Sequence, residues 1–209
     1  MLEDLRSMVV AEEFDYPLLM RCLQGYSKPR DRVTKWLKTG AITRVKKGLY
    51  VFGEKYRRGP ICLSSLANLI YGPSYISKEY ALSFYGLIPE RVDLVTSMTT
   101  QKTKIFSTPI GNFSYTHLNL TKYTPGICLK EIDELHVCLI ASPEKAMADL
   151  IASQKSIASQ EELLEHLLEN LRVDEEGLYK LNLPHLKIIA AAYQNKRVTW
   201  LYEIVGRQK

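Results

Sequence analysis

The sequence predicts an α+β fold, and three observations lead to this prediction. Helix-type apolar spacing occupies residues 15–38 and most of the chain after residue 142, while β-prone runs fill much of the stretch between them. Basic residues concentrate in one window near the N-terminus. The segment Arg57-Arg58-Gly59-Pro60 has the composition of a linker. We therefore expect two domains, residues 1–58 and residues 59–209.

Composition excludes several classes of protein. The chain has 209 residues, of which 46% are hydrophobic and 24% charged, so it is neither disordered nor low in complexity. No run approaches 18 apolar residues, and the acidic, mixed N-terminus does not read as a signal peptide, so we expect a cytoplasmic protein without membrane contact. The four cysteines never form CxxC, so we expect small buried hydrophobes: Cys22, Cys62, Cys128 and Cys138.

Positive charge is unevenly distributed. The window from Arg21 to Arg58 holds twelve Lys and Arg residues against only Asp31 and Glu54, a net charge of +10, while the whole chain carries +5. Such asymmetry indicates an anionic partner for the N-terminal part. The simpler alternative is a solvated basic face. The pattern of helices and strands inside the window favours an anionic partner over this alternative.

Two short helices are expected first. Asp15 is suited to cap a helix that has Pro17 in its first turn and ends by Gly25. Ser27 is expected to cap the next helix, again with a proline, Pro29, in its first turn, and Gly40 is expected to terminate it. One apolar stripe of this second helix has i, i+3, i+4 spacing: Val33, Trp36 and Leu37.

A basic β-hairpin follows the two helices. The β-prone runs 41–45 and 49–52 flank the turn Lys46-Lys47-Gly48. Two short helices followed by a basic hairpin is the order of a winged helix-turn-helix, in which the second helix enters the DNA major groove and the hairpin lies on the backbone or in the minor groove. Lys and Arg would neutralise phosphates, and Arg30, Arg32 or Thr34 could reach base edges. The candidate DNA-binding residues are Lys28, Arg30, Arg32, Thr34, Lys35, Lys38, Arg44, Lys46 and Lys47.

The central segment predicts a mainly antiparallel sheet with helices. Residues 63–70 and 78–85 have helical patterns, the second with Ser77 as its cap and Gly86 at its end. Four stretches are strand-like: 92–97, 104–106, 112–115 and 135–141. A helix capped by Ser142 with Pro143 in its first position then begins.

A helical tail is expected over about residues 155–209. Ser159 to Glu162 form a capping box before a stripe of leucines at 163, 164, 167, 168 and 171. Further helices are expected over 174–181, 184–193 and 196–205. The acidic face beside the leucines, which includes Glu161 and Glu165, is either solvated or meets a basic partner protein.

Catalytic and cofactor motifs are missing from the sequence, so we expect no enzyme, no cofactor and no metal. The histidines lack metal-ligand spacing, and there is no GxGxxG, P-loop or GxSxG. A nuclease alternative would use Glu144 and Lys145 with Asp133. Glu144 and Lys145 are adjacent at the start of a helix, and helix capping is sufficient to explain their presence there.

Several motifs in one order resemble a known family. They are Tyr26–Val33, Lys46–Phe52, Leu66–Ser77, Tyr80–Glu90, Ala141–Ala146 and Asp149-Leu150. Together, from about residue 14 to 151, they resemble the AbiEi-type antitoxins of type IV toxin–antitoxin systems, which are bacterial abortive-infection proteins and transcriptional regulators. The helical tail after residue 154 carries no such motif.

The resemblance implies two roles. The winged helix would bind inverted repeats in its own promoter as an autorepressor, and the remainder would counteract a nucleotidyltransferase toxin without needing a stable complex with it. Two copies on an inverted repeat would increase affinity without a dimer in solution. Three alternatives stay open: a stand-alone regulator without a toxin partner, a protein-interaction module with the winged helix as scaffold, and a nucleic-acid enzyme.

Overall fold

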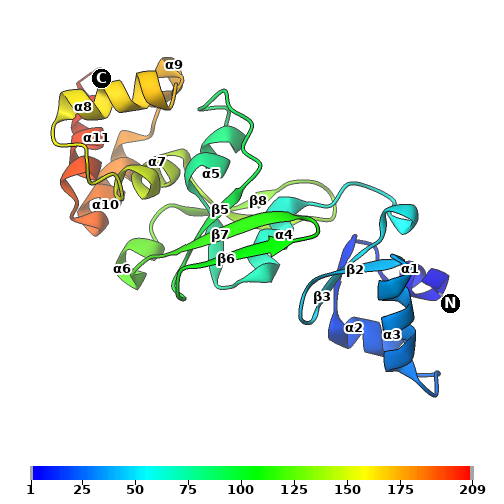
Figure 1. The fold of residues 1–209 in the computed structure, drawn as a ribbon. Helices are drawn as coiled ribbons and strands as arrows, with labels where there is room; N and C mark the ends of the chain where they lie inside the picture. The colour runs from blue at the N-terminus through cyan, green and yellow to red at the C-terminus, as the bar shows by residue number, and fades with distance from the viewer. Residues whose placement is uncertain (1, 208–209) are drawn as a thin grey trace.

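The computed structural model describes residues 2–207 and shows an α+β protein with two hydrophobic cores (Figure 1). The described residues form eleven α-helices, a three-stranded antiparallel sheet near the N-terminus and a six-stranded mixed sheet. We call residues 2–58 the smaller unit and residues 59–207 the larger unit. In the described part of the chain, no helix is long and apolar enough to cross a membrane.

The smaller unit surrounds the first core. Its elements are α1 (Leu2–Met8), β1 (Glu13–Asp15), α2 (Tyr16–Cys22), α3 (Pro29–Lys38), β2 (Ile42–Lys46), β3 (Leu49–Phe52) and the 3₁₀ turn η1 (Glu54–Tyr56). The sheet order is β1-β3-β2, antiparallel throughout. Asp15 caps α2 as expected, because its carboxylate accepts a hydrogen bond from the Leu18 amide at 2.9 Å. The hairpin β2–β3 confirms the expected pair of strands around Gly48, whose φ of +87° suits glycine.

Strand β3 lies between the two cores and is buried on both faces. Tyr50 and Phe52 pack into the core of the smaller unit, whereas Leu49 and Val51 pack into the core of the larger one. Alternation along a strand sends successive side chains to opposite faces, so a four-residue apolar run fits this position. The three-stranded sheet is therefore a layer between the two units.

The larger unit is built on a mixed sheet. Its first elements are α4 (Leu63–Ile70), β4 (Ser74–Ile76), α5 (Lys78–Phe84), β5 (Val95–Thr99), β6 (Lys104–Thr108), β7 (Gly111–His117), α6 (Leu120–Tyr123), β8 (Ile127–Glu131) and β9 (Val137–Ala141). The strand order is β6-β7-β5-β4-β9-β8. The β5–β7 and β4–β9 pairs are parallel and the other three are antiparallel. The prediction of a mainly antiparallel sheet is thus only partly right, because parallel neighbours arise where the chain crosses over.

The C-terminal helices share the second core with the sheet. They are α7 (Pro143–Ile151), α8 (Gln160–Glu165), the π-helical turn η2 (His166–Asn170), α9 (Glu175–Tyr179), α10 (Leu183–Tyr193) and α11 (Lys196–Gly206). Leu163 and Leu167 of the expected leucine stripe are buried in that core, and Glu161 and Glu165 beside it are exposed. The helical tail is a continuation of the larger unit.

Several local expectations were wrong. Helix α3 has Lys28 at its N-cap without a side-chain cap, so Ser27 does not cap it. Ser77 precedes α5, but its hydroxyl donates to Asp149 instead of capping the helix. Of the four cysteines only Cys138 is buried. Strands β1, β4 and β8 were not predicted: β1 and β4 have only three residues each, and β8 ends in the charged pair Lys130-Glu131.

Candidate nucleic-acid interface

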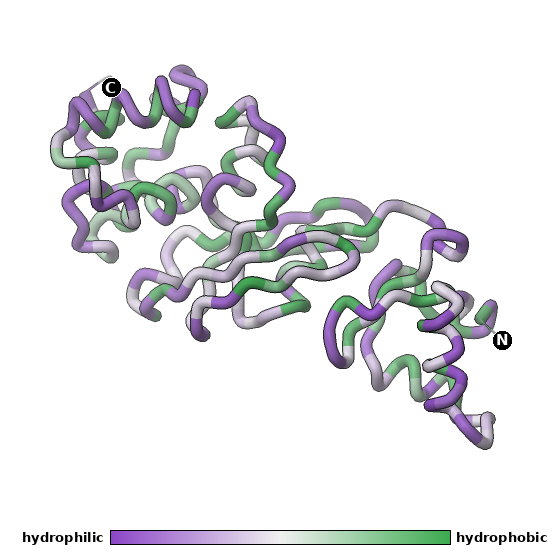
Figure 2. The backbone as a smooth tube through the Cα atoms, viewed as in Figure 1, coloured by the Kyte–Doolittle hydropathy of each residue, from purple (hydrophilic) through white to green (hydrophobic). Residues whose placement is uncertain are grey.

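Helix α3 is held by one apolar stripe and exposes the rest of its surface. Val33 and Trp36 are buried in the core of the smaller unit, with Leu37 half-buried beside them. Pro29 occupies the first turn, and Gly40 ends the helix region with a φ of +68°. Figure 2 colours much of α3 as hydrophilic. The helix therefore has a fixed inner face and a charged outer face.

The predicted DNA-binding residues are mostly exposed. Exposed positions are Lys28, Arg30, Thr34, Lys35, Lys38, Arg44 and Lys47, while Arg32 and Lys46 are half-buried. Within residues 2–207, none of the eight cations in this set pairs with a carboxylate, although Asp31 and Glu54 are nearby in sequence. Clustered cations without carboxylate partners repel one another, and an anionic ligand would relieve that repulsion.

Two polar side chains of α3 have defined neighbours. The Arg32 guanidinium lies over the ring of Tyr26, 5.3 Å from its centroid. This contact restricts the arginine side chain and orients its planar donors. The Thr34 hydroxyl donates to the Arg30 carbonyl oxygen at 3.0 Å, so it is free only as an acceptor. Tyr26 was not among the candidate residues; its spacing of six residues from Arg32 across a turn gave no signal in the sequence.

The structure separates Arg44 from Lys46 on strand β2. A register shift between these residues places Arg44 opposite Tyr50 and Lys46 opposite Leu49. Because Tyr50 and Leu49 face different cores, the two cations point to different sides of the sheet. Lys46 Nζ donates to the Ile70 carbonyl oxygen in α4 at 2.5 Å. Burial lowers the pKa of Lys46, and the nearby Lys104 ammonium lowers it further. Lys46 therefore contacts the larger unit through Ile70, whereas Arg44 lies on the other face of the sheet.

The end of the hairpin is fixed against α3 by a close backbone approach. A Cβ on Gly53 would lie 1.7 Å from the Gly40 carbonyl oxygen, so only glycine fits there. The Gly53 amide donates to the Ala41 carbonyl oxygen at 2.9 Å. The end of α3 and the end of β3 are therefore held in one arrangement, which leaves the cations of the helix and of Arg44 on a rigid frame.

Two contacts attach the smaller unit to the larger one at β1. The Glu13 carboxylate accepts a hydrogen bond from the Ser65 hydroxyl at 3.3 Å and lies 3.3 Å from His136 Nε2. His136 Nδ1 in turn contacts the Asp133 carboxylate at 2.7 Å. His136 is buried, and its neighbours are carboxylates from both units.

The residues of the nuclease alternative have separate partners. Glu144 accepts a hydrogen bond from the Asn182 amide at 2.8 Å, Asp133 holds His136, and Lys145 lies in the interior. Among residues 2–207, no group of three or more His, Cys, Asp or Glu side chains is arranged to hold a metal ion. Ser142 caps α7 through the Lys145 amide, as predicted.

Lys145 belongs to a buried polar cluster that the sequence did not reveal. Its Nζ lies 3.6 Å from Asp149 and donates to the Tyr193 hydroxyl at 2.7 Å and to the Lys122 carbonyl. Asp149 also accepts hydrogen bonds from the hydroxyls of Tyr75 and Ser77. Burial lowers the pKa of Lys145 to about 8 and raises the pKa of Asp149. These contacts link α7 to α10, to β4 and to the residue that precedes α5.

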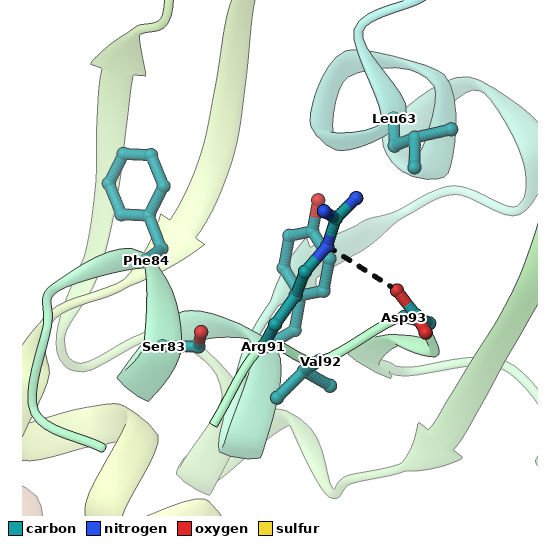
Figure 3. Close-up of a pocket in the computed structure, with 7 residues that line it drawn as sticks. Leu63, Ser83, Phe84, Arg91, Val92 and Asp93 are labelled. Carbon is teal, nitrogen blue, oxygen red and sulfur yellow. Dashed lines mark ion pairs between the residues drawn. The ribbon is translucent and has the colours of Figure 1, made fainter. Parts of the chain in front are cut away.

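Surface hollows are also found on the larger unit. Figure 3 shows one of about 250 Å³ between α4 and α5, in which Arg91 points toward Asp93. The Arg91–Asp93 pair is separated by 3.6 Å, and each side chain is more than nine-tenths exposed. An exposed pair of this kind contributes little energy. The α3 surface is therefore the strongest candidate site.

No protein-family model matches this chain, and a comparison with curated proteins finds no match.

Proposed function

We propose that this protein is a DNA-binding transcriptional autorepressor with a winged helix-turn-helix. In this proposal α2 and α3 form the helix-turn-helix, α3 is the recognition helix and β2–β3 is the wing. The observation that carries the proposal is the row of cations on the outer face of α3, exposed and without carboxylate partners in the described chain. A duplex phosphate backbone supplies the missing negative charge at regular spacing.

The candidate residues divide into two groups by chemistry. Arg30 and Arg32 offer planar, bidentate donors suited to guanine O6 and N7, and Tyr26 holds Arg32 in place. The lysines and Arg44 are suited to phosphates, which set register without reading sequence: Lys28, Lys35, Lys38 and Lys47. Lys46 is left out of the contact set because it binds the Ile70 carbonyl.

The proposed target is an inverted repeat in the promoter of the protein's own gene. One winged helix with a single recognition helix contacts few base pairs, so one copy has limited affinity. Two copies on adjacent half-sites would bind more tightly through effective concentration, without a dimer in solution.

We further propose that the protein acts in the cytoplasm as the antitoxin of a type IV toxin–antitoxin system. This part rests on the motif resemblance from about residue 14 to 151. The functional partner would be a nucleotidyltransferase toxin. Growth of cells that express the toxin from a neighbouring gene, with and without this protein, tests it. Unrelieved toxicity, or no toxin gene beside this one, leaves a stand-alone regulator.

The DNA-binding proposal is tested by fluorescence anisotropy. The full chain is titrated against labelled DNA from upstream of its gene and against a scrambled duplex, at two salt concentrations. We expect tighter binding to the upstream duplex and a marked loss of affinity at higher salt. Equal weak binding to both duplexes would reject the repressor role and leave α3 as a solvated basic face.

A second candidate function is a protein-interaction module. The β8–β9 hairpin exposes Leu129, Leu135 and Val137, each at least half exposed. Exposed apolar side chains gathered on one hairpin favour contact with another protein. If DNA binding fails, substitution of these three residues by Ser in a growth-rescue assay separates a protein contact from an inert surface.

A further inference from the structure

The edge of the larger unit next to the wing has an unusual composition. Residues 94–130 contain four lysines and no Asp or Glu: Lys102, Lys104, Lys122 and Lys130. This stretch includes β6, the edge strand of the six-stranded sheet, and the turn before it. The positive potential of the chain therefore continues beyond the basic window of the smaller unit.

Lys104 is held beside the wing. Its ammonium lies over the rings of Phe106 and Tyr71, 4.7 Å and 5.8 Å from their centroids. Tyr71 directly follows Ile70, whose carbonyl binds Lys46 of the wing. The contacts made by Lys104 and Lys46 thus bring the cationic edge of the larger unit and the basic wing to one place.

The turn that carries Lys102 is fixed by its own hydrogen bonds. The His117 amide donates to the Thr103 hydroxyl at 3.0 Å, and His117 Nδ1 contacts the Gln101 carbonyl oxygen at 2.9 Å. The Gln101 amide donates to the Thr99 hydroxyl at 3.1 Å. Both Lys102 and Lys104 are exposed, and neither pairs with a carboxylate of residues 2–207. The cations are therefore presented on an ordered turn, which lowers the entropic cost of binding an anion.

We propose that Lys102 and Lys104 bind the phosphate backbone of the same DNA duplex that α3 reads. The larger unit then extends the interface from the wing, through Lys47, along the β6 edge. This inference rests on the proposed DNA-binding function. It assigns to the larger unit a share in DNA affinity in addition to any role toward a toxin.

The test compares salt dependence of DNA binding for three full-length proteins. They are the wild type, Lys102→Ala/Lys104→Ala, and a control that removes two exposed lysines far along the chain, Lys155→Ala/Lys187→Ala. The control matches the loss of net charge. Each is titrated by anisotropy on the upstream duplex over a salt series, and circular dichroism melts confirm equal folding.

We expect the log-affinity against log-salt slope to shrink by about two for Lys102→Ala/Lys104→Ala, roughly 0.9 for each lost phosphate contact. The control is expected to keep the wild-type slope, and Lys104→Arg is expected to bind like the wild type. If the double variant and the control have equal slopes, the inference is overturned. In that case, salt-dependent binding of the wild type to the upstream duplex would still support the repressor proposal. Failure of the wild type to bind rejects both.

Discussion

Helices α3 and α7 begin in the same way and use their charges in opposite ways. Each has a proline in its first turn and a charged residue close behind it. In α3 only Val33 and Trp36 are buried, whereas in α7 every residue from Glu144 to Ile151 is buried. The cations of α3 pair with no carboxylate of residues 2–207, and the charges of α7 have partners inside the protein.

The difference shows that the role of a charged side chain depends more on whether the fold supplies a partner of opposite charge than on the residue type. Asp149 is surrounded by Lys145 and three hydroxyl groups, so its charge is satisfied within the fold. Lys35 and Lys38 have no carboxylate to pair with among the described residues, so their charge is available to a ligand. Four changes test or sharpen this comparison, and we take them from the largest expected effect to the smallest.

Removal of the buried cation should produce the largest effect. Lys145→Ala leaves Asp149 buried without its cation, and we expect a loss of about 3–5 kcal/mol in the free energy of unfolding. The matched change on α3, Lys35→Ala, should alter stability by about 0.5 kcal/mol or less, because the side chain is exposed. Urea denaturation followed by circular dichroism measures both. Similar losses for the two variants would show that α3 and α7 do not differ in this way.

DNA binding should show the opposite ranking. Lys35→Ala with Lys38→Ala should reduce the salt slope of DNA binding by about two, since two phosphate contacts are lost. Lys145→Met, which keeps a long neutral side chain in the interior, should leave that slope unchanged once folding is confirmed. The anisotropy assay described above measures both proteins. An unchanged slope for the α3 variant would remove its lysines from the interface.

The pH dependence of stability distinguishes the buried lysine from exposed ones. The pKa of Lys145 is about 8 in the folded protein, against about 10.4 in an unfolded chain. Between these values the unfolded chain binds more protons, so the contribution of Lys145 to stability rises with pH, by up to about 1.4 kcal/mol per pH unit.

This rise is isolated by a difference between two proteins. The unfolding free energies of the wild type and of Lys145→Met are compared from about pH 7.5 to about pH 9.5. We expect the difference to move in favour of the wild type as pH increases. A constant difference would mean that Lys145 keeps an ordinary pKa and that its ammonium is not penalised by burial.

Much of the outline could be predicted from local sequence, and the interior polar contacts could not. Asp15, Gly40 and Ser142 act where local rules place them, because capping depends on a few neighbouring residues. The Lys145–Tyr193 contact joins residues 48 positions apart, so no local pattern encodes it. The parallel β4–β9 pair likewise depends on how the chain crosses over.

The same limit applies to the candidate site. Charge and helical spacing are local properties, so the outward cations of α3 could be located from the sequence. The side to which Lys46 points depends on a register shift in β2 and on α4, which lies far along the chain. Tyr26 beside Arg32 depends on the conformation of the turn between α2 and α3.

The adjacent lysines of the wing turn give the finest test of the comparison, because one is paired with the fold and the other is not. Lys47→Ala should reduce the salt slope of DNA binding by about one and leave stability unchanged, since Lys47 is exposed. Lys46→Ala should leave the slope unchanged and cost about 1 kcal/mol of stability, because the hydrogen bond to the Ile70 carbonyl is lost. Anisotropy and urea denaturation on the two single variants measure both quantities. Equal effects on the slope would place both lysines on DNA and would require the wing to leave α4 when DNA binds.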